Sequence, residues 1–200
     1  PPEQAPAGRI FPRPTFDEET LAEQKQDLTR TEVAQPALGA VEVGMLGVLE
    51  RFGLHPEAVA GHSFGELVAL HAAGRLEADD LIRLSALRGH LMSQANQGQG
   101  SMLAVQAPLE EIAALAAETG VVLANRNHPL QGVLSGTREA LARAEAICQE
   151  RNWQARPLEV SAAFHSPLLE STREPFAEAP AKLPFPPGTV PAYANASAKP

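Results

Sequence analysis

Apolar side chains recur at helical spacing over residues 31–52, and this pattern predicts the first long helix of the chain. Thr31 is a suitable N-cap for this helix, and Gly53 followed by Pro56 ends it. The recurring apolar positions are Leu38, Val41, Met45, Val48, Leu49 and Phe52. The segment is therefore predicted to be a helix.

A strand and two more helices are predicted directly after this helix. Residues 57–60 are a short apolar run typical of a strand, and the turn GHSFG leads into a second helix that ends at Gly74. Asp79 and Asp80 suit the positive N-terminal end of a third helix. The inward side of that helix carries Leu81, Leu84 and Leu91.

The pattern changes after residues 97–101, QGQGS, which interrupt the helical periodicity. Strands and helices are then predicted in the order β-α-β-β-α-β, with a turn at Pro129 between the second and third strands. The segments are MLAVQ, PLEEIAALAAETG, VVLAN, GVLSG, TREALARAEAICQER and ARPLEV. This order is the signature of a ferredoxin-like subdomain, here inserted into a larger α/β unit.

The two ends of the chain have a different composition. Residues 1–14 contain five prolines and no apolar periodicity, which is typical of a tail or linker. The last stretch predicts a loop, a helix, a proline-rich connection and a short strand. The predicted organisation is a tail or linker over 1–30, a partial α/β core over 31–98 and 160–200, and the ferredoxin-like subdomain over 99–159.

Composition and charge narrow the class of protein. The 200 residues with 44% hydrophobic content are enough for a core, and no apolar run reaches the length of a membrane span, so a soluble domain is expected. The net charge of -8, without any Lys/Arg-rich block, argues against nucleic acid or an anionic membrane as partner. The single cysteine, Cys148, fits a reducing, cytoplasmic compartment and is predicted to be a structural thiol.

The stretch GHSFGEL, residues 61–67, has the Gly-x-Ser-x-Gly pattern of a nucleophile elbow. A strand is predicted before it and a helix after it, as an elbow requires. Ser63 would then be a nucleophile, and the backbone N–H of Phe64 would be the natural donor to an oxyanion. The alternative is a tight turn in which the serine only caps the helix.

A nucleophilic serine needs a base, and His165 is the candidate because it follows an apolar strand on a loop. His62 adjoins Ser63, but its side chain is expected to point away from it and could line the pocket. No aspartate follows Asp80, so a glutamate or a backbone carbonyl must orient His165, which favours a dyad over a triad. The remaining histidines are predicted to be surface or packing residues: His55, His71, His90 and His128.

Arg88 falls on the inward side of the third predicted helix, four residues after Leu84. A buried guanidinium must be paired to offset its desolvation. One explanation is a structural ion pair with Glu66 or another acid. The other is a bidentate site for a substrate carboxylate, which arginine suits better than lysine.

Together these segments resemble the malonyl/acyl-CoA:acyl carrier protein transacylase family, which includes the acyltransferase domains of polyketide and fatty-acid synthases. GHSFGEL matches the family's GHSxGE motif, and Arg88 stands at its arginine position, 25 residues after Ser63. The other similar segments are TEVAQPALGAVEVGMLGVLE, NRNHPLQGVLSG, AAFHSPLL and YANASAKP. These matches run in order from about residue 31 to residue 200.

The resemblance implies a mechanism and partners. Ser63 would attack the thioester of malonyl-CoA with His165 as general base, and Arg88 would hold the free carboxylate of malonate. An acyl carrier protein would then collect the acyl group on its phosphopantetheine thiol. No bound cofactor or metal is implied, an α/β-hydrolase-like core is expected below the ferredoxin-like subdomain, and a neighbouring ketosynthase is an expected partner.

The resemblance also implies substrate-binding roles for His62, Phe64, Phe164 and Asn127. Phe164 stands before His165 as in the HAFH tetrapeptide of malonyl-using polyketide acyltransferases, although Ala162 departs from that tetrapeptide. A phenylalanine there would crowd the α-methyl branch of methylmalonate. The motifs look closest to those of iterative synthases that make polyunsaturated fatty acids or enediynes.

Two features of the family are missing from these residues. No GQGxQ loop, whose glutamine helps to form the oxyanion hole, precedes Thr31, and no Q-L-x-x-P-V-x-W segment follows YANASAKP. The chain is therefore expected to be an interior piece of a longer acyltransferase, or a chain whose ends were removed. A proofreading acyl hydrolase with the same serine and histidine, and an inactive structural or docking domain, are the alternatives.

Overall fold

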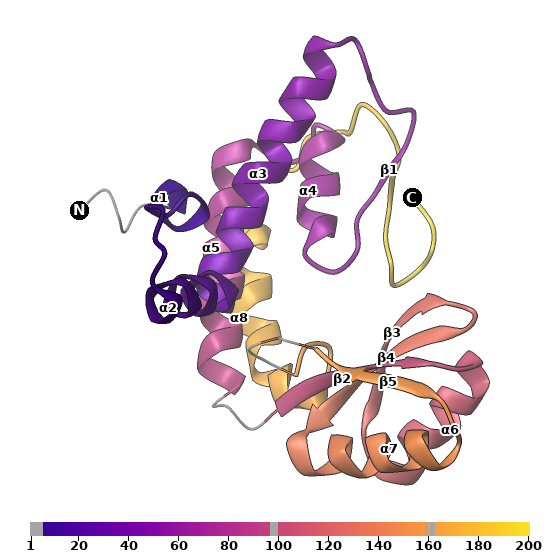
Figure 1. The fold of residues 1–200 in the computed structure, drawn as a ribbon. Helices are drawn as coiled ribbons and strands as arrows, with labels where there is room; N and C mark the ends of the chain where they lie inside the picture. Colours follow the sequence, from indigo (N-terminus) through magenta and orange to yellow (C-terminus); the bar gives the residue numbers. More distant parts are fainter. Residues whose placement is uncertain (1–5, 97–99, 159, 161–162) are drawn as a thin grey trace. The chain divides into compact units, whose positions relative to one another are not determined.

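The computed structural model describes residues 6–96, 100–158, 160 and 163–200, which form two compact units (Figure 1). The described residues of the first unit come from Pro1–Leu28, Glu32–His90 and Pro175–Pro200, and those of the second from Thr29–Thr31 and Leu91–Glu174. The predicted break at 97–101 lies partly outside the described residues. Its last two residues, Gly100 and Ser101, already belong to a strand.

The second unit contains a four-stranded antiparallel sheet with the strand order β3-β4-β2-β5. Its elements are β2 (Gly100–Gln106), α6 (Leu109–Thr119), β3 (Val122–His128), β4 (Gln131–Thr137), α7 (Arg138–Glu150) and β5 (Gln154–Pro157). The element order is the β-α-β-β-α-β order predicted from the sequence. Helix η2 (Pro167–Thr172) follows in this unit, and α8 (Arg173–Glu178) begins in it and continues into the first unit from Pro175 onward.

The core of the second unit lies between this sheet and the helices α6 and α7, which cover one of its faces (Figure 1). Leu103 and Leu134 of the sheet belong to one apolar cluster with Ile112, Leu115 and Cys148 of the helices, and all five are buried. Full burial of one leucine or isoleucine contributes roughly 1.5–3 kcal/mol. Desolvation raises the pKa of Cys148, which supports the prediction of a structural thiol.

The first unit is mainly helical, with one short parallel sheet. Its elements are α1 (Pro6–Ile10), α2 (Glu18–Thr29), α3 (Thr31–Arg51), β1 (Val59–Ala60), α4 (Gly65–Ala72), α5 (Ala78–Asn96, up to His90), η3 (Pro180–Lys182) and β6 (Ala192–Tyr193). Strand β1 pairs in parallel with β6, with Val59 opposite Ala192. Leu81 and Leu84 of α5 are buried together with Leu76, as the pattern of the third predicted helix indicates.

Helix α3 confirms the first predicted helix, with Thr31 as its first residue instead of its N-cap. Its first turns are buried at Val33, Gln35 and Ala37, but the later apolar positions are exposed: Leu38, Val41, Met45, Val48, Leu49 and Phe52. Within the described residues, α3 is the one helix long and apolar enough to cross a membrane, although a core helix of a soluble protein meets the same criterion. Helical periodicity thus predicts the element and its apolar positions, but not what covers them.

Helices α1 and α2 lie within residues 1–30, where the sequence predicted only a tail or linker. Asp17 caps α2, because its Oδ2 accepts a hydrogen bond from the N–H of Thr20 at 2.8 Å. No residue of α2 is buried. The helix therefore lacks the apolar stripe that periodicity detects, and its acidic N-cap was the available signal.

Candidate active site

Ser63 lies at a sharp turn between strand β1 and helix α4. Its φ is +52°, in the left-handed region that non-glycine residues rarely adopt. Helix α4 begins at Gly65, and its N-cap, Phe64, makes no side-chain capping hydrogen bond. A strained serine between a strand and a helix is the geometry of a nucleophile elbow, so the structure favours this interpretation over a capping serine.

Gly61 is required because two parts of this turn approach each other closely. A Cβ atom at Gly61 would overlap with the carbonyl group of Gly65 and would lie 2.5 Å from the backbone nitrogen of Glu66. A Cβ atom at Gly65, the second glycine of the motif, would meet open space. Only the first glycine of the motif is therefore required by sterics here.

We expect Gly61→Ala to lower the free energy of unfolding by about 3 kcal/mol, because the new methyl group would overlap with backbone atoms that cannot move cheaply. Gly65→Ala is the matched control, and alanine in a helix is favoured over glycine by up to about 1 kcal/mol. Urea denaturation of both variants measures the difference. Equal losses of stability would contradict the steric role of Gly61.

One backbone N–H beside Ser63 is free to bind an anion. The N–H of Gly65 donates to the carbonyl of His62 at 2.9 Å, and the N–H of Glu66 donates to the carbonyl of Ser63 at 3.2 Å. The N–H of Phe64 has no acceptor in the described part of the chain. An unsatisfied N–H at a helix N-terminus next to a nucleophile is suited to stabilise an oxyanion.

Arg88 reaches Ser63 from helix α5. Its Nη2 donates to Ser63 Oγ at 3.3 Å, and its Nη1 donates to Gln35 Oε1 at 2.8 Å. Burial lowers the pKa of Arg88 and the negative charge of Glu66 raises it, but an arginine stays charged at neutral pH. The structure thus places a cation directly beside the hydroxyl of Ser63.

Glu66 does not form the ion pair with Arg88 that was one interpretation of the sequence. Among the described residues the carboxylate of Glu66 accepts a hydrogen bond from the backbone N–H of Asn195 at 2.7 Å instead. The side-chain amide of Asn195 donates to the carbonyl of Gly61. These contacts join the elbow to the segment after β6, a role of Asn195 that sequence reasoning missed.

A hollow of about 600 Å³ lies beside the elbow, between α3, β1 and α4. Its lining includes His62, which is exposed, Phe64, which is buried, and the apolar side chains of Leu38 and Val68. Glu42 also lines it, and partial burial raises the pKa of this carboxyl. His62 and Phe64 thus border a cavity, and their role in substrate binding stays a prediction.

The other predicted site residues, His165, Phe164 and Asn127, belong to the second unit. His165 is exposed and has a φ of +57° on the loop before η2, and Asn127 is exposed on β3. The loop is held at Ala163, whose carbonyl accepts a hydrogen bond from Ser166 Oγ at 2.8 Å. The pairing of His165 with Ser63 stays a prediction.

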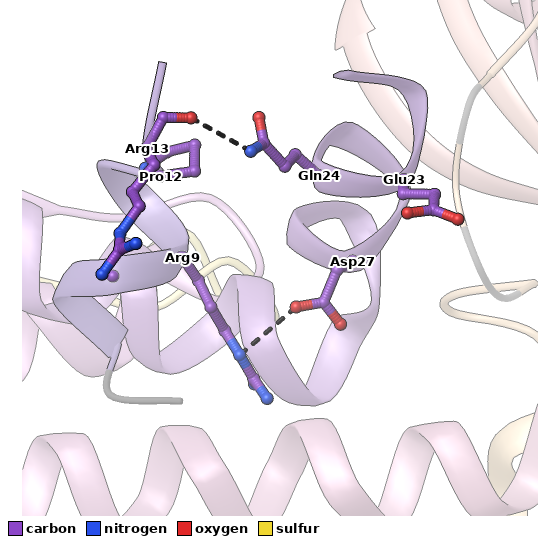
Figure 2. A pocket seen from close by; sticks show the side chains of 7 residues that line it. Arg9, Pro12, Arg13, Glu23, Gln24 and Asp27 are labelled. Atoms are coloured by element: carbon purple, nitrogen blue, oxygen red, sulfur yellow. Dashed lines mark hydrogen bonds and ion pairs between the residues drawn. The ribbon is translucent and has the colours of Figure 1, made fainter. Parts of the chain in front are cut away.

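A second hollow, of about 370 Å³, lies between α1 and α2 (Figure 2). An ion pair joins Arg9 Nε to Asp27 Oδ2 at 3.3 Å across it, and Gln24 donates to the carbonyl of Arg13 at 3.2 Å. Among the described residues its lining contains no serine, cysteine or histidine. These contacts hold the two helices together, and the chemistry predicted from the sequence lies elsewhere.

A strained serine at a strand-to-helix elbow, with an N–H at the helix N-terminus and a guanidinium beside it, is an arrangement typical of enzymes that transfer acyl groups. Comparison with known proteins agrees with this class. The chain belongs to the acyl transferase domain family, whose profile matches residues 18–200. The match begins inside the range 1–30 that the sequence assigned to a tail or linker.

The chain is similar to multidomain synthases and to solved acyltransferase structures. It is 39% identical over 170 residues to the spectinabilin polyketide synthase system protein NorB of Streptomyces orinoci, covering 84% of this chain and 8% of that protein. The acyltransferase domain of an iterative polyketide synthase in enediyne biosynthesis is 40% identical, with a TM-score of 0.77 over 82% of this chain and 44% of that one. The chain is also similar to a structure described as a type II polyketide synthase acyl-carrier protein in complex with its malonyl-transacylase. The sequence identity is 33% and the TM-score is 0.83, and the match covers 88% of this chain and 59% of that chain. The chain therefore spans about half the length of these solved acyltransferase chains.

Proposed function

We propose that this chain carries the catalytic serine of an acyltransferase that moves a malonyl unit from CoA to the phosphopantetheine thiol of an acyl carrier protein. Ser63 Oγ attacks the thioester carbon while His165 accepts its proton. The C–S bond breaks, and His165 gives the proton to the departing CoA thiolate. The carrier thiol then attacks the seryl ester, and its proton returns through His165 to Ser63 Oγ. The N–H of Phe64 stabilises the oxyanion in both steps.

The position of Arg88 carries this proposal. Its guanidinium donates to Ser63 Oγ at 3.3 Å and has no carboxylate partner among the described residues. A malonyl group on Ser63 would bring a carboxylate into reach of this cation and satisfy its charge. The related complex of a malonyl-transacylase with an acyl-carrier protein supports the same substrate and partner.

We expect Arg88→Ala to lower kcat/KM for malonyl transfer on the order of 100-fold, because a charge-assisted hydrogen bond contributes roughly 1.5–3 kcal/mol. Acetyl transfer, which offers no carboxylate, should fall far less. Arg83→Ala is the matched control, since Arg83 lies on the same helix and its exposed guanidinium forms an ion pair with Asp80 at 3.4 Å. Equal losses for malonyl and acetyl donors would rule out a carboxylate-binding role.

Product analysis separates transfer from hydrolysis and from an inactive domain. The protein containing the complete domain is mixed with labelled malonyl-CoA, with and without an acyl carrier protein that bears its phosphopantetheine arm. We expect label on the carrier protein. Rapid release of free malonate in the presence of carrier would favour the proofreading hydrolase, and no turnover would favour a structural or docking domain.

The fold assignment and the finer specificity belong to the same proposal. The βαββαβ unit, residues 99–159, is the ferredoxin-like subdomain, inserted into an α/β-hydrolase-like core over 31–98 and 160–200. The sheet order β3-β4-β2-β5 supports the first assignment.

Within this proposal His62, Phe64, Phe164 and Asn127 contact the substrate, and Phe164 excludes an α-methyl branch. The enzyme acts in the cytoplasm without a bound cofactor or metal, next to domains such as a ketosynthase. Similarity to the acyltransferase domain of an enediyne-type iterative synthase supports the assignment to a synthase.

A further inference from the structure

Gln35 is the second group that holds the guanidinium of Arg88. Gln35 lies near the start of α3, is 5% exposed, and accepts a hydrogen bond from Arg88 Nη1 at 2.8 Å. Arginine carries only donors, so the amide oxygen of Gln35 has to face it. Arg88 thus contacts both Gln35 on α3 and Ser63 on the turn before α4, all within the first unit.

The chemical group at residue 35 decides whether the positive charge of Arg88 is compensated inside the protein. A carboxylate there would pair with the guanidinium and neutralise it, whereas an amide oxygen orients it and leaves the full positive charge. Of the five N–H donors of a guanidinium, Arg88 uses one toward Gln35 and one toward Ser63 in the described residues. The other donors of Arg88 make no hydrogen bond within the described residues, so a ligand carboxylate can accept from them.

Glu66 forms no ion pair with Arg88 among the described residues. Glu66 acts on Arg88 electrostatically, but its carboxylate accepts a hydrogen bond from the N–H of Asn195. The cation beside Ser63 is therefore hydrogen-bonded to the neutral amide of Gln35 and not to the carboxylate of Glu66.

We propose that Gln35 is a positioning residue that sets selectivity for acyl groups with a free carboxylate, by aiming Arg88 at the acyl group on Ser63 without neutralising it. This inference rests on the proposed function, because it assumes that the acyl group is delivered to Ser63. It extends that function by assigning selectivity to a buried amide that does not itself contact the substrate.

Two variants of the complete acyltransferase test the inference, with the ratio of kcat/KM for malonyl-CoA to kcat/KM for acetyl-CoA as the readout. Gln35→Met keeps the size of the side chain but removes the acceptor, and Gln35→Glu keeps an acceptor but adds the neutralising charge. We expect the ratio to fall about tenfold or more in both variants, as loss of one hydrogen bond to a charged group predicts. Ser85→Ala is the matched control, because Ser85 is a buried polar residue one turn before Arg88 whose hydroxyl, within the described part of the chain, donates to the carbonyl of Leu81.

A double-mutant cycle separates positioning from a general loss of packing. If Gln35 acts through Arg88, Gln35→Met should no longer change the ratio in an Arg88→Ala background. An unchanged ratio in both single variants, or an equal effect of Gln35→Met with and without Arg88, would overturn the role of Gln35. Neither result would affect the proposed function. Failure of the unaltered enzyme to load malonyl on Ser63 would overturn the proposed function together with this inference.

Discussion

Ser63→Ala is expected to abolish the acyl-enzyme and to lower malonyl transfer on the order of 10⁵-fold, because no other group can form the covalent intermediate. The variant should fold normally. Ser63 is only partly buried, and alanine removes a single oxygen atom. Transfer of labelled malonyl groups to the carrier protein measures the loss, with circular dichroism as the check on folding.

Ser197→Ala is the control for this variant, since Ser197 is an exposed serine in the last turn of the chain. It should keep full activity. Substantial malonyl transfer by Ser63→Ala would show that the elbow serine is not the nucleophile, and the account of the site would have to be abandoned.

His165→Ala is expected to slow both acylation and transfer by roughly 10²–10⁴-fold, the usual contribution of a general acid–base group. Binding of malonyl-CoA should change little, because the carboxylate is held by Arg88, so the loss should appear in kcat more than in KM. Stopped-flow release of CoA measures acylation, and added imidazole should partly restore the rate.

His128→Ala is the matched control for this variant, because His128 is an exposed histidine of the same unit, at the end of β3. Its rates should equal those of the unaltered protein. A similar loss in both variants, or no loss in His165→Ala, would contradict the assignment of His165 as the base.

The second unit could be predicted from sequence because its signals are local. Ile112 and Leu115 form an apolar stripe on α6, the turn at Pro129 separates β3 from β4, and Thr137 caps α7 by accepting the N–H of Ala140 at 3.2 Å. Each element therefore carries its own boundaries and its own buried side. The predicted β-α-β-β-α-β order of elements therefore agrees with the structure of this unit.

The first unit could be predicted less well because its elements depend on distant partners. Strand β1 has two residues instead of the four predicted, because its partner β6 pairs with it only over Val59 and Ala60. Helix α3 carries the predicted apolar positions, yet Met45 and Phe52 are 61% and 80% exposed. A sequence pattern records which residues are apolar but not which segment covers them.

The same distinction applies to the candidate site. Ser63 and Gly61 follow from a local motif whose backbone geometry is set within a few residues. Arg88 was recognisable as a charge on an inward helix side, but its partner Gln35 lies 53 residues away and Asn195 bonds a carbonyl 134 residues away. Such contacts are set by tertiary packing, so a local pattern of residue types does not predict them.

In the proposed reaction, malonyl groups pass through an ester on Ser63. The most direct measurement is rapid mixing with malonyl-CoA, acid quenching, proteolysis and mass spectrometry of the peptide that contains residues 61–67. We expect a malonyl ester on Ser63 that appears as CoA is released and disappears, with an equal gain on the carrier protein, when the carrier is added. Release of CoA with an unmodified Ser63, or a malonyl group on another residue, would contradict the account.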